Sequence, residues 1–165
     1  CKQRCNWPAR SLVDALPAAA RRQAQLTQVF FYHGAADKIA AACALLSGAY
    51  AKKKPMLVYA VDNSVASSVD RMLWTHSALS FVPHCRADSP LAAETPILIT
   101  DKLETIAQDE RLMNLSQEIP PGFSRFESLI EVVGQEESDR DKARDRVKFY
   151  KDRGYEVRYF DLSDR

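Results

Sequence analysis

The chain has 165 residues and a nearly balanced charge, with 23 lysines and arginines against 22 aspartates and glutamates. The length predicts one domain with a single core, and the net charge of +1 excludes recognition of nucleic acid through a strong overall positive field. No apolar run approaches the roughly 20 residues of a membrane span, and the four cysteines lack the pattern of a disulfide scaffold, so we expect a cytoplasmic protein with reduced thiols and no membrane contact.

The first 25 residues differ in composition from the rest of the chain. They are rich in alanine, arginine and glutamine and are interrupted by Pro8 and Pro17. We expect residues 1–25 to be a non-native or disordered N-terminal extension and residues 26–165 to form a single α/β domain. The alternative is an amphipathic helical leader over residues 11–25, since alanine and arginine both favour helix.

Short apolar runs alternate with helical stripes from residue 28 onward. Residues 29–32 are typical of a strand, and the apolar spacing over residues 39–50 predicts a helix. Residues 56–61 are apolar at every position, which is typical of a parallel strand that is covered on both faces. The apolar residues between 63 and 74 recur on one helical face and predict a second helix.

The second half of the chain continues this alternation. Strands are predicted at residues 97–99, 112–116, 129–133 and 155–160, with a turn at 120–122 and a long charged helix over 136–153. Gly154 stands where the end of this helix requires a left-handed residue. Strands that alternate with helices predict a three-layer α/β sandwich with a mostly parallel, Rossmann-like sheet.

Three aspartates follow predicted strands, namely Asp37, Asp62 and Asp101. Converging carboxylates at this edge of a sheet can hold magnesium for phosphotransfer or nuclease chemistry. The other interpretation is that these side chains cap helices, which is common at this position. No nucleotide cofactor is expected, because the first turn after a strand, at residues 33–37, has one glycine and matches neither the dinucleotide fingerprint nor the phosphate loop.

Metal and nucleophile motifs are weak in this chain. Cys1 and Cys5 have no second pair at the spacing of a zinc site. His84 and Cys85 are adjacent, so in an extended segment their side chains point to opposite faces. We therefore expect no metal, cofactor or catalytic residue here. The lysines at 52–54 are interpreted as a solvated turn, so any contact with DNA is expected to be weak or indirect.

Two constellations suit contact with other proteins. The first comprises Trp74, Phe81 and Pro83, in which two aromatic side chains offer a large apolar area and the proline fixes the turn between them and the next element. On the sequence alone these aromatic side chains either fill the core or form an exposed anchor.

The second constellation lies on the last predicted helix. Arg140, Arg144, Lys148 and Lys151 follow one another at spacings of four, four and three residues, which predicts a basic ridge. An apolar stripe of Ala143, Val147 and Tyr150 borders it. The ridge is either a solvated charged face or a site for an acidic partner.

The segments Leu73-Trp74, Phe81-Val82-Pro83-His84, Glu131-Val132-Val133 and Gly154-Tyr155 resemble the chi subunit of the bacterial DNA polymerase III holoenzyme. The resemblance extends over about residues 28–165 and is weakest from 87 to 125. It implies a non-catalytic accessory protein of the clamp loader that acts in DNA replication.

The resemblance also implies two partners. Trp74, Phe81 and Pro83 are expected to bind the psi subunit in a heterodimer. Arg144, Val147, Lys148 and Lys151 are expected to bind the acidic C-terminal tail of single-stranded-DNA-binding protein, although Val147 stands where relatives can have tyrosine and Lys151 where they can have arginine. The alternative function is a magnesium-dependent phosphotransfer or nuclease domain that uses Asp37, Asp62 and Asp101.

Overall fold

The computed structural model describes residues 27–75 and 81–163, which contain seven strands and three α-helices. The strands are β1 (Gln28–Ala35), β2 (Met56–Tyr59), β3 (His84–Arg86), β4 (Ile97–Thr100), β5 (Arg111–Asn114), β6 (Ser128–Gly134) and β7 (Val157–Asp161). The helices are α2 (Lys38–Ala51), α3 (Asn63–Thr75) and α4 (Glu137–Asp152), and a short 3-10 turn, η2, spans Phe123–Arg125. The extension predicted for residues 1–25 lies outside the described residues.

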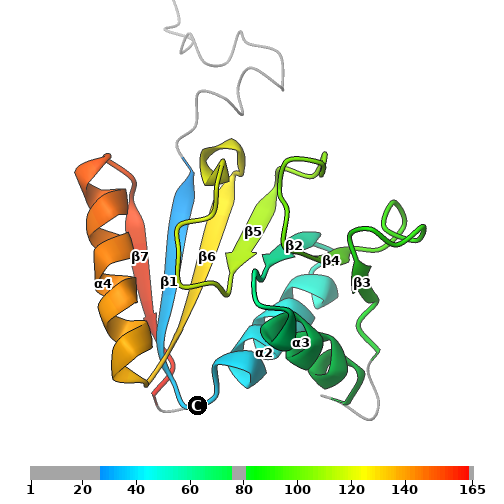
Figure 1. Cartoon of the computed structure of the whole chain (residues 1–165), viewed down its shortest axis with the longest axis horizontal. Coiled ribbons are helices and arrows are strands. Elements are labelled where there is room, and N and C mark those ends of the chain that lie inside the picture. Colours follow the sequence, from blue (N-terminus) through cyan, green and yellow to red (C-terminus); the bar gives the residue numbers. More distant parts are fainter. Residues whose placement is uncertain (1–26, 76–80, 164–165) are drawn as a thin grey trace, which may run out of the picture.

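The strands form one sheet in the order β3-β4-β2-β5-β6-β1-β7, and every neighbouring pair is parallel. Figure 1 shows α2 and α3 beside each other near the β2 and β3 part of the sheet, and α4 next to β7 at the opposite edge. This arrangement confirms the prediction of an α/β domain with a parallel sheet. None of the helices in the described part of the chain has the length and apolar character needed to cross a membrane.

The two faces of the sheet carry separate apolar clusters, and β6 contributes to both. Its Ile130 and Val132 pack with α2 and α3, whereas Leu129 and Val133 point to the other face. On that other face α4 covers one part of the sheet, and apolar side chains from the segments between β4 and β6 cover the rest. Helices therefore lie on both sides of the sheet, which is the three-layer arrangement that the alternation of elements predicted.

Element boundaries differ from the sequence prediction in a few places. Strand β3 was not predicted, because three residues are too few to show a periodicity. The last strand begins at Val157 rather than at residue 155, because the backbone N–H of Tyr155 donates to the Tyr150 carbonyl at 3.0 Å and closes the end of α4. Gly154 has the predicted left-handed backbone, with φ of 81°.

Candidate protein-binding surfaces

A cavity of about 900 Å³ lies between α4 and strands β1, β6 and β7, and we call it the α4 cavity. Its lining includes the predicted residues of the basic ridge together with the valine beside them, namely Arg140, Arg144, Val147, Lys148 and Lys151. The fold therefore gathers the cations of one helical stripe around a single hollow rather than leaving them on a flat surface.

The floor of the α4 cavity is apolar. Phe31, Val133 and Ala143 line it and are buried, and Val147 packs against this cluster while remaining half-buried. One wall is the exposed ring of Tyr159 from β7. An apolar floor beside a row of cations is suited to a ligand that carries an apolar group and negative charges close together.

The cations of the ridge differ in their local contacts. Arg144 donates to Asp141 one turn earlier on the same helix, and both side chains are exposed. Lys151 places its ammonium nitrogen 5.2 Å from the centre of the Tyr159 ring. Within the described residues, neither Arg140 nor Lys148 is paired with an acidic side chain. Both of these side chains are exposed and line the cavity, which suits contact with an acidic ligand.

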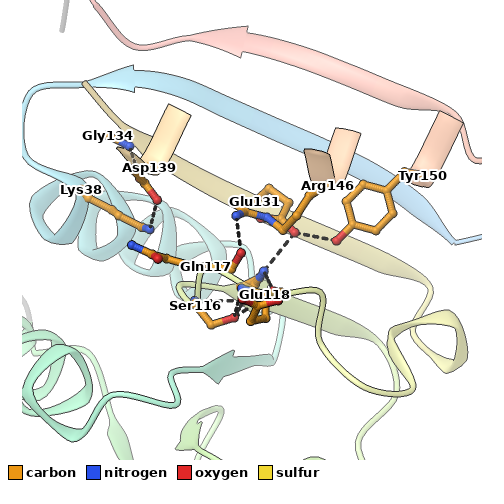
Figure 2. A network of polar contacts seen from close by, with 10 residues as sticks. Lys38, Ser116, Gln117, Glu118, Glu131, Gly134, Asp139, Arg146 and Tyr150 are labelled. Atoms are coloured by element: carbon orange, nitrogen blue, oxygen red, sulfur yellow. Dashed lines mark hydrogen bonds and ion pairs between the residues drawn. The ribbon is translucent and has the colours of Figure 1, made fainter. Parts of the chain in front are cut away.

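A buried polar network holds α4 on the sheet (Figure 2). Glu131 of β6 accepts from Arg146 Nε at 3.0 Å, from the Tyr150 hydroxyl at 2.7 Å and from Asn114 Nδ2 at 3.0 Å. Arg146 also donates to the Gln117 carbonyl at 2.9 Å. The side chains of these four residues, Glu131, Arg146, Tyr150 and Asn114, are all buried. The network therefore determines which face of α4 packs on the sheet and which is exposed.

The charges in this network compensate one another. Burial raises the pKa of Glu131, while the Arg146 guanidinium and the hydrogen bonds from Asn114 and Tyr150 act in the opposite direction. Burial and the neighbouring Glu131 carboxylate raise the pKa of Tyr150, so its hydroxyl keeps its proton and donates. A second nitrogen of Arg146 lies 3.0 Å from the same Glu131 oxygen without forming an aligned hydrogen bond.

A second anchor lies at the start of α4. Asp139 accepts from the Gly134 backbone N–H at 2.8 Å and from Lys38 Nζ at 3.0 Å, and the three residues appear together in Figure 2. This carboxylate is buried and links α4 to the end of β6 and to α2. The helix is therefore fixed near both of its ends, and the ridge of cations is held in one orientation.

The aromatic surface, formed by Trp74 of α3 and Phe81, lies beside β3. The exposed fractions of Trp74 and Phe81 are 60% and 54%, and their ring centres are 4.9 Å apart. The structure thus excludes the interpretation in which these side chains fill the core. Pro83 follows them and is half-buried, while Val82 is buried below.

His84 supports the aromatic surface from beneath. Its ring centre lies 5.3 Å from that of Trp74 and 6.3 Å from that of Phe81. Its Nδ1 is 2.7 Å from the Val82 carbonyl oxygen and its Nε2 is 3.2 Å from the Asp70 carbonyl oxygen. These contacts connect α3 to β3 and hold both aromatic rings in place. This role of His84 was not predicted, because no local pattern in the chain shows which side chains lie below Trp74 and Phe81.

The three aspartates of the alternative enzyme function have different contacts and do not lie together in one site. Asp37 accepts from the backbone N–H groups of Ile39 and Ala40 at 2.8 and 3.0 Å, and so caps α2. Asp62 accepts from the Ser64 N–H at 2.7 Å, and this hydrogen bond lowers the pKa of Asp62. Asp101 lines a different cavity from Asp62. No group of three metal-binding side chains occurs within residues 27–75 and 81–163.

Some residues of the α4 cavity were not found from the sequence. Tyr159 and Phe31 are neighbours through the pairing of β7 with β1, which sequence spacing does not reveal. His33 also lines the cavity, and its Nδ1 is 3.9 Å from an oxygen of Asp161. Among the described residues, this lining carries four arginines and lysines against one acid, Asp152, and it includes none of the candidate Mg²⁺ residues.

These observations define a three-layer α/β domain whose candidate sites are two surfaces suited to protein contact, an aromatic one and a basic one with an apolar floor. The chain belongs to the family described as DNA polymerase III chi subunit, HolC, whose model matches residues 26–158. The resemblance seen in the sequence is thereby confirmed, and the chain is an accessory subunit by family rather than an enzyme.

Curated relatives agree with this assignment. The chain is 29% identical over 134 residues to the DNA polymerase III subunit chi of Pseudomonas aeruginosa, covering 79% of this chain and 93% of that protein. It is 27% identical to the subunit of the same name from Haemophilus influenzae, over 70% of this chain and 81% of the relative. For the Escherichia coli subunit chi the identity is 25%, with 70% and 79% covered.

Proposed function

We propose that this protein bridges the clamp loader, through the psi subunit, to the C-terminal tail of single-stranded-DNA-binding protein during DNA replication. The observation that supports the proposal is that an exposed aromatic surface and a basic cavity with an apolar floor lie at opposite edges of one sheet. The aromatic surface lies beside the edge strand β3, and the α4 cavity lies beside the edge strand β7. Each surface is therefore accessible while the other is occupied.

The α4 cavity fits the end of an acidic peptide. A C-terminal residue carries its side chain and its free carboxylate on the same Cα, so a binding site must offer an apolar surface and a cation within a few ångströms. Lys151 above the Tyr159 ring provides this combination at 5.2 Å. Arg144 and Lys148 flank the cavity and are placed to meet the aspartates that precede the terminus.

The aromatic surface fits an obligate partner such as psi. Trp74 and Phe81 expose a large apolar area, and the contacts with His84 mean that little side-chain freedom is lost when a partner binds. Aromatic residues that are held in this way dominate the binding energy of many interfaces. Pro83 stiffens the chain beside them and completes the proposed psi contact.

Contact with DNA plays at most an indirect part in this proposal. The charge of the chain is balanced, and the lysines at 52–54 are exposed in and after the turn that follows α2 rather than lining the α4 cavity. Exposed ion pairs are individually weak and are screened by salt, so the tail contact is expected to be modest in affinity. Retention of the polymerase on a template coated with single-stranded-DNA-binding protein then comes from several linked contacts rather than from one tight site.

The test of the α4 cavity is a titration with a labelled acidic peptide that ends in a free carboxylate. Lys148→Ala should weaken binding by about 1 kcal/mol, or roughly fivefold, because one cation is lost at the opening of the cavity. Lys142→Ala is the matched control, since Lys142 is exposed on the same helix but does not line the cavity. Equal affinity in both variants would contradict the placement of the tail, and no binding by the wild type at low salt would contradict the proposed function.

The test of the aromatic surface is co-purification with psi from the same organism. Trp74→Ala should cost at least about 2 kcal/mol of binding, which is roughly 30-fold, because a central anchor is removed. Its thermal unfolding should change little, since Trp74 is mostly exposed. Tyr50→Ala serves as control, because Tyr50 is also exposed but lies on α2. A Trp74→Ala variant that folds and binds psi normally would refute this assignment.

A further inference from the structure

A second cavity, of about 680 Å³, lies at the carboxyl ends of strands β1, β2, β5 and β6, and we call it the carboxyl-end cavity. We propose that it binds a basic segment of a further partner protein, in which arginine side chains alternate with aliphatic ones. Among the described residues, Gln135 is the one that lines both this cavity and the α4 cavity. The inference therefore goes beyond the proposed function and adds a third site of contact.

The fold places this cavity where parallel sheets of α/β proteins bind ligands. Strands β1 and β6 are neighbours, but the chain continues from β1 into α2 on one face of the sheet and from β6 into α4 on the other face. Neighbouring strands whose connections diverge in this way leave a crevice at their carboxyl ends, and that crevice is the usual ligand site. Ala36 directly follows β1, Gly134 ends β6, and both line the cavity.

Part of the lining is aliphatic. Ile39 contributes from the first turn of α2, Val61 from the segment after β2, and Val65 from the first turn of α3. Ile39 and Val65 are half-buried, and Val61 keeps 57% of its surface exposed. These side chains leave apolar area that a ligand with apolar groups can cover, which favours its binding.

The charge of the lining is acidic. Lys38 is the one lysine or arginine among the described lining residues, and its Nζ is 3.0 Å from the buried carboxylate of Asp139. The other acids of the lining, Asp62, Glu118 and Glu136, are exposed. Within the described residues no ion pair joins them to a cation. The cavity thus has the opposite charge to the α4 cavity and suits a cationic ligand.

The arrangement of these carboxylates favours an elongated cation over a metal ion. Asp62, Glu118 and Glu136 come from three separate segments, and no group of three metal-binding side chains occurs in the described part of the chain. An arginine guanidinium binds a carboxylate through paired hydrogen bonds, while the aliphatic stem of the arginine packs on apolar surface. A segment that alternates arginine with aliphatic residues matches both the acids and the aliphatic part of the lining.

The loop after β5 holds its part of the lining in place before a ligand arrives. Asn114 Oδ1 accepts from the Ser116 backbone N–H at 3.0 Å, and Asn114 Nδ2 donates to the Glu118 carbonyl at 3.0 Å. The Gln117 carbonyl accepts from Arg146 at 2.9 Å (Figure 2). A loop that is already ordered loses little freedom on binding, so more of the contact energy contributes to affinity.

The test uses two labelled, end-capped peptides. One alternates arginine with valine, and the other has citrulline, a neutral isostere, in place of each arginine. The proteins are the wild type, the double variant Glu118→Gln with Glu136→Gln, the single variant Val61→Ser, and the control Glu104→Gln with Glu137→Gln. The control removes the same net charge, and both of its glutamates are exposed but do not line the cavity.

The wild type should bind the arginine peptide at low salt and bind the citrulline peptide at least about tenfold more weakly. The double variant Glu118→Gln with Glu136→Gln should bind the arginine peptide about tenfold more weakly than the wild type, as expected for two exposed ion pairs, and the control should bind it like the wild type. Val61→Ser should weaken this binding about threefold without a change in its salt dependence.

Nuclear magnetic resonance spectra of the wild type locate the site without any substitution. The arginine peptide should shift the backbone amide signals of Val61 and Ser116 and leave those of Trp74 and Tyr159 in place. The proposal is overturned if the wild type does not bind the arginine peptide at low salt, if both double variants weaken binding equally, or if the shifted signals belong to other surfaces. Thermal unfolding of each variant shows whether its fold is intact.

Discussion

The buried pair of Arg146 and Glu131 allows a quantitative prediction about stability. Arg146→Met keeps the length of the side chain but removes the charge that faces Glu131, and it also removes the hydrogen bond to the Gln117 carbonyl. A buried charge that loses its partner costs about 3–5 kcal/mol of folding free energy. We therefore expect the variant to unfold in urea with about that much less stability than the wild type near pH 8.

The pH dependence of this loss has a definite sign. Burial already holds the pKa of Glu131 above its ordinary value, and Arg146 is the strongest opposing influence. Removal of Arg146 raises this pKa further, so folded Arg146→Met takes up a proton at a higher pH than its unfolded chain does. Its stability therefore rises as the pH falls from above the folded pKa toward the unfolded one. The difference from the wild type should be smaller at about pH 5 than at about pH 8.

Two further variants isolate the cause. Arg144→Met removes a guanidinium from the same helix, but its ion pair with Asp141 is exposed, so the change in stability should stay within about 0.5 kcal/mol. Adding Glu131→Gln to Arg146→Met removes the buried charge and should recover part of the stability and abolish the pH effect. The reasoning is refuted if Arg146→Met costs less than about 1 kcal/mol near pH 8, or if its cost is independent of pH.

Two other predictions concern a backbone position and a thiol. Gly34 has φ of 79°, and a Cβ there would clash with the side chains of Ser163 and Asp161, so Gly34→Ala should cost about 2–3 kcal/mol in chemical unfolding. Gly122→Ala, with φ of 66° and open space around it, should cost about 1 kcal/mol, and an equal loss at both sites would contradict the predicted clash. Burial raises the pKa of the Cys43 thiol to about 12, so in the folded protein a thiol reagent should label half-buried Cys85 much faster than Cys43, as read by peptide mapping. Comparable labelling rates would show that the core around Cys43 opens readily.

The class of fold was predictable from the sequence because its signals are local. Residues 56–61 are apolar throughout and residues 129–133 are apolar except for Glu131, and such runs indicate strands that are covered on both faces. The order of the strands was not predictable in the same way. Strand β6 lies between β5 and β1, so the first strand pairs with one that is about 100 residues later in the chain, and no local pattern encodes that pairing.

The buried contacts that anchor α4 to the sheet could not be predicted from the sequence. Glu131 lies within a run that reads as an apolar strand, and a single carboxylate in such a run requires a buried partner. Its partner Arg146 looked like one more charge on a charged helix, and Asp139 looked like an acid favoured by the helix dipole. Burial separates these residues from the exposed charges around them, and burial is a property of the folded chain.

The sequence predicted the stripe of cations at the α4 cavity, but it did not predict which other residues line the cavity. Arg144, Lys148 and Lys151 recur at helical spacing, which the sequence displays directly. Tyr159 belongs to a different element and reaches the cavity through its pairing with Phe31. In the same way, the sequence left the environment of Trp74 open, because burial of an aromatic side chain at a helix end depends on what the next segment covers.

The position of the two surfaces at the β3 and β7 edges also has a mechanical consequence. Seven strands span about 29 Å from edge to edge at the usual spacing, so a pull between two bound partners runs perpendicular to the strands. Each pairing of neighbouring strands then carries the whole force, because the pairings lie one after another between the two edges. The shortest pairings, β3 with β4 and β2 with β5, have three residue pairs each, so these two are expected to separate first. His84 joins β3 to α3, so under the proposed bridging function it shares the load at the pairing of β3 with β4.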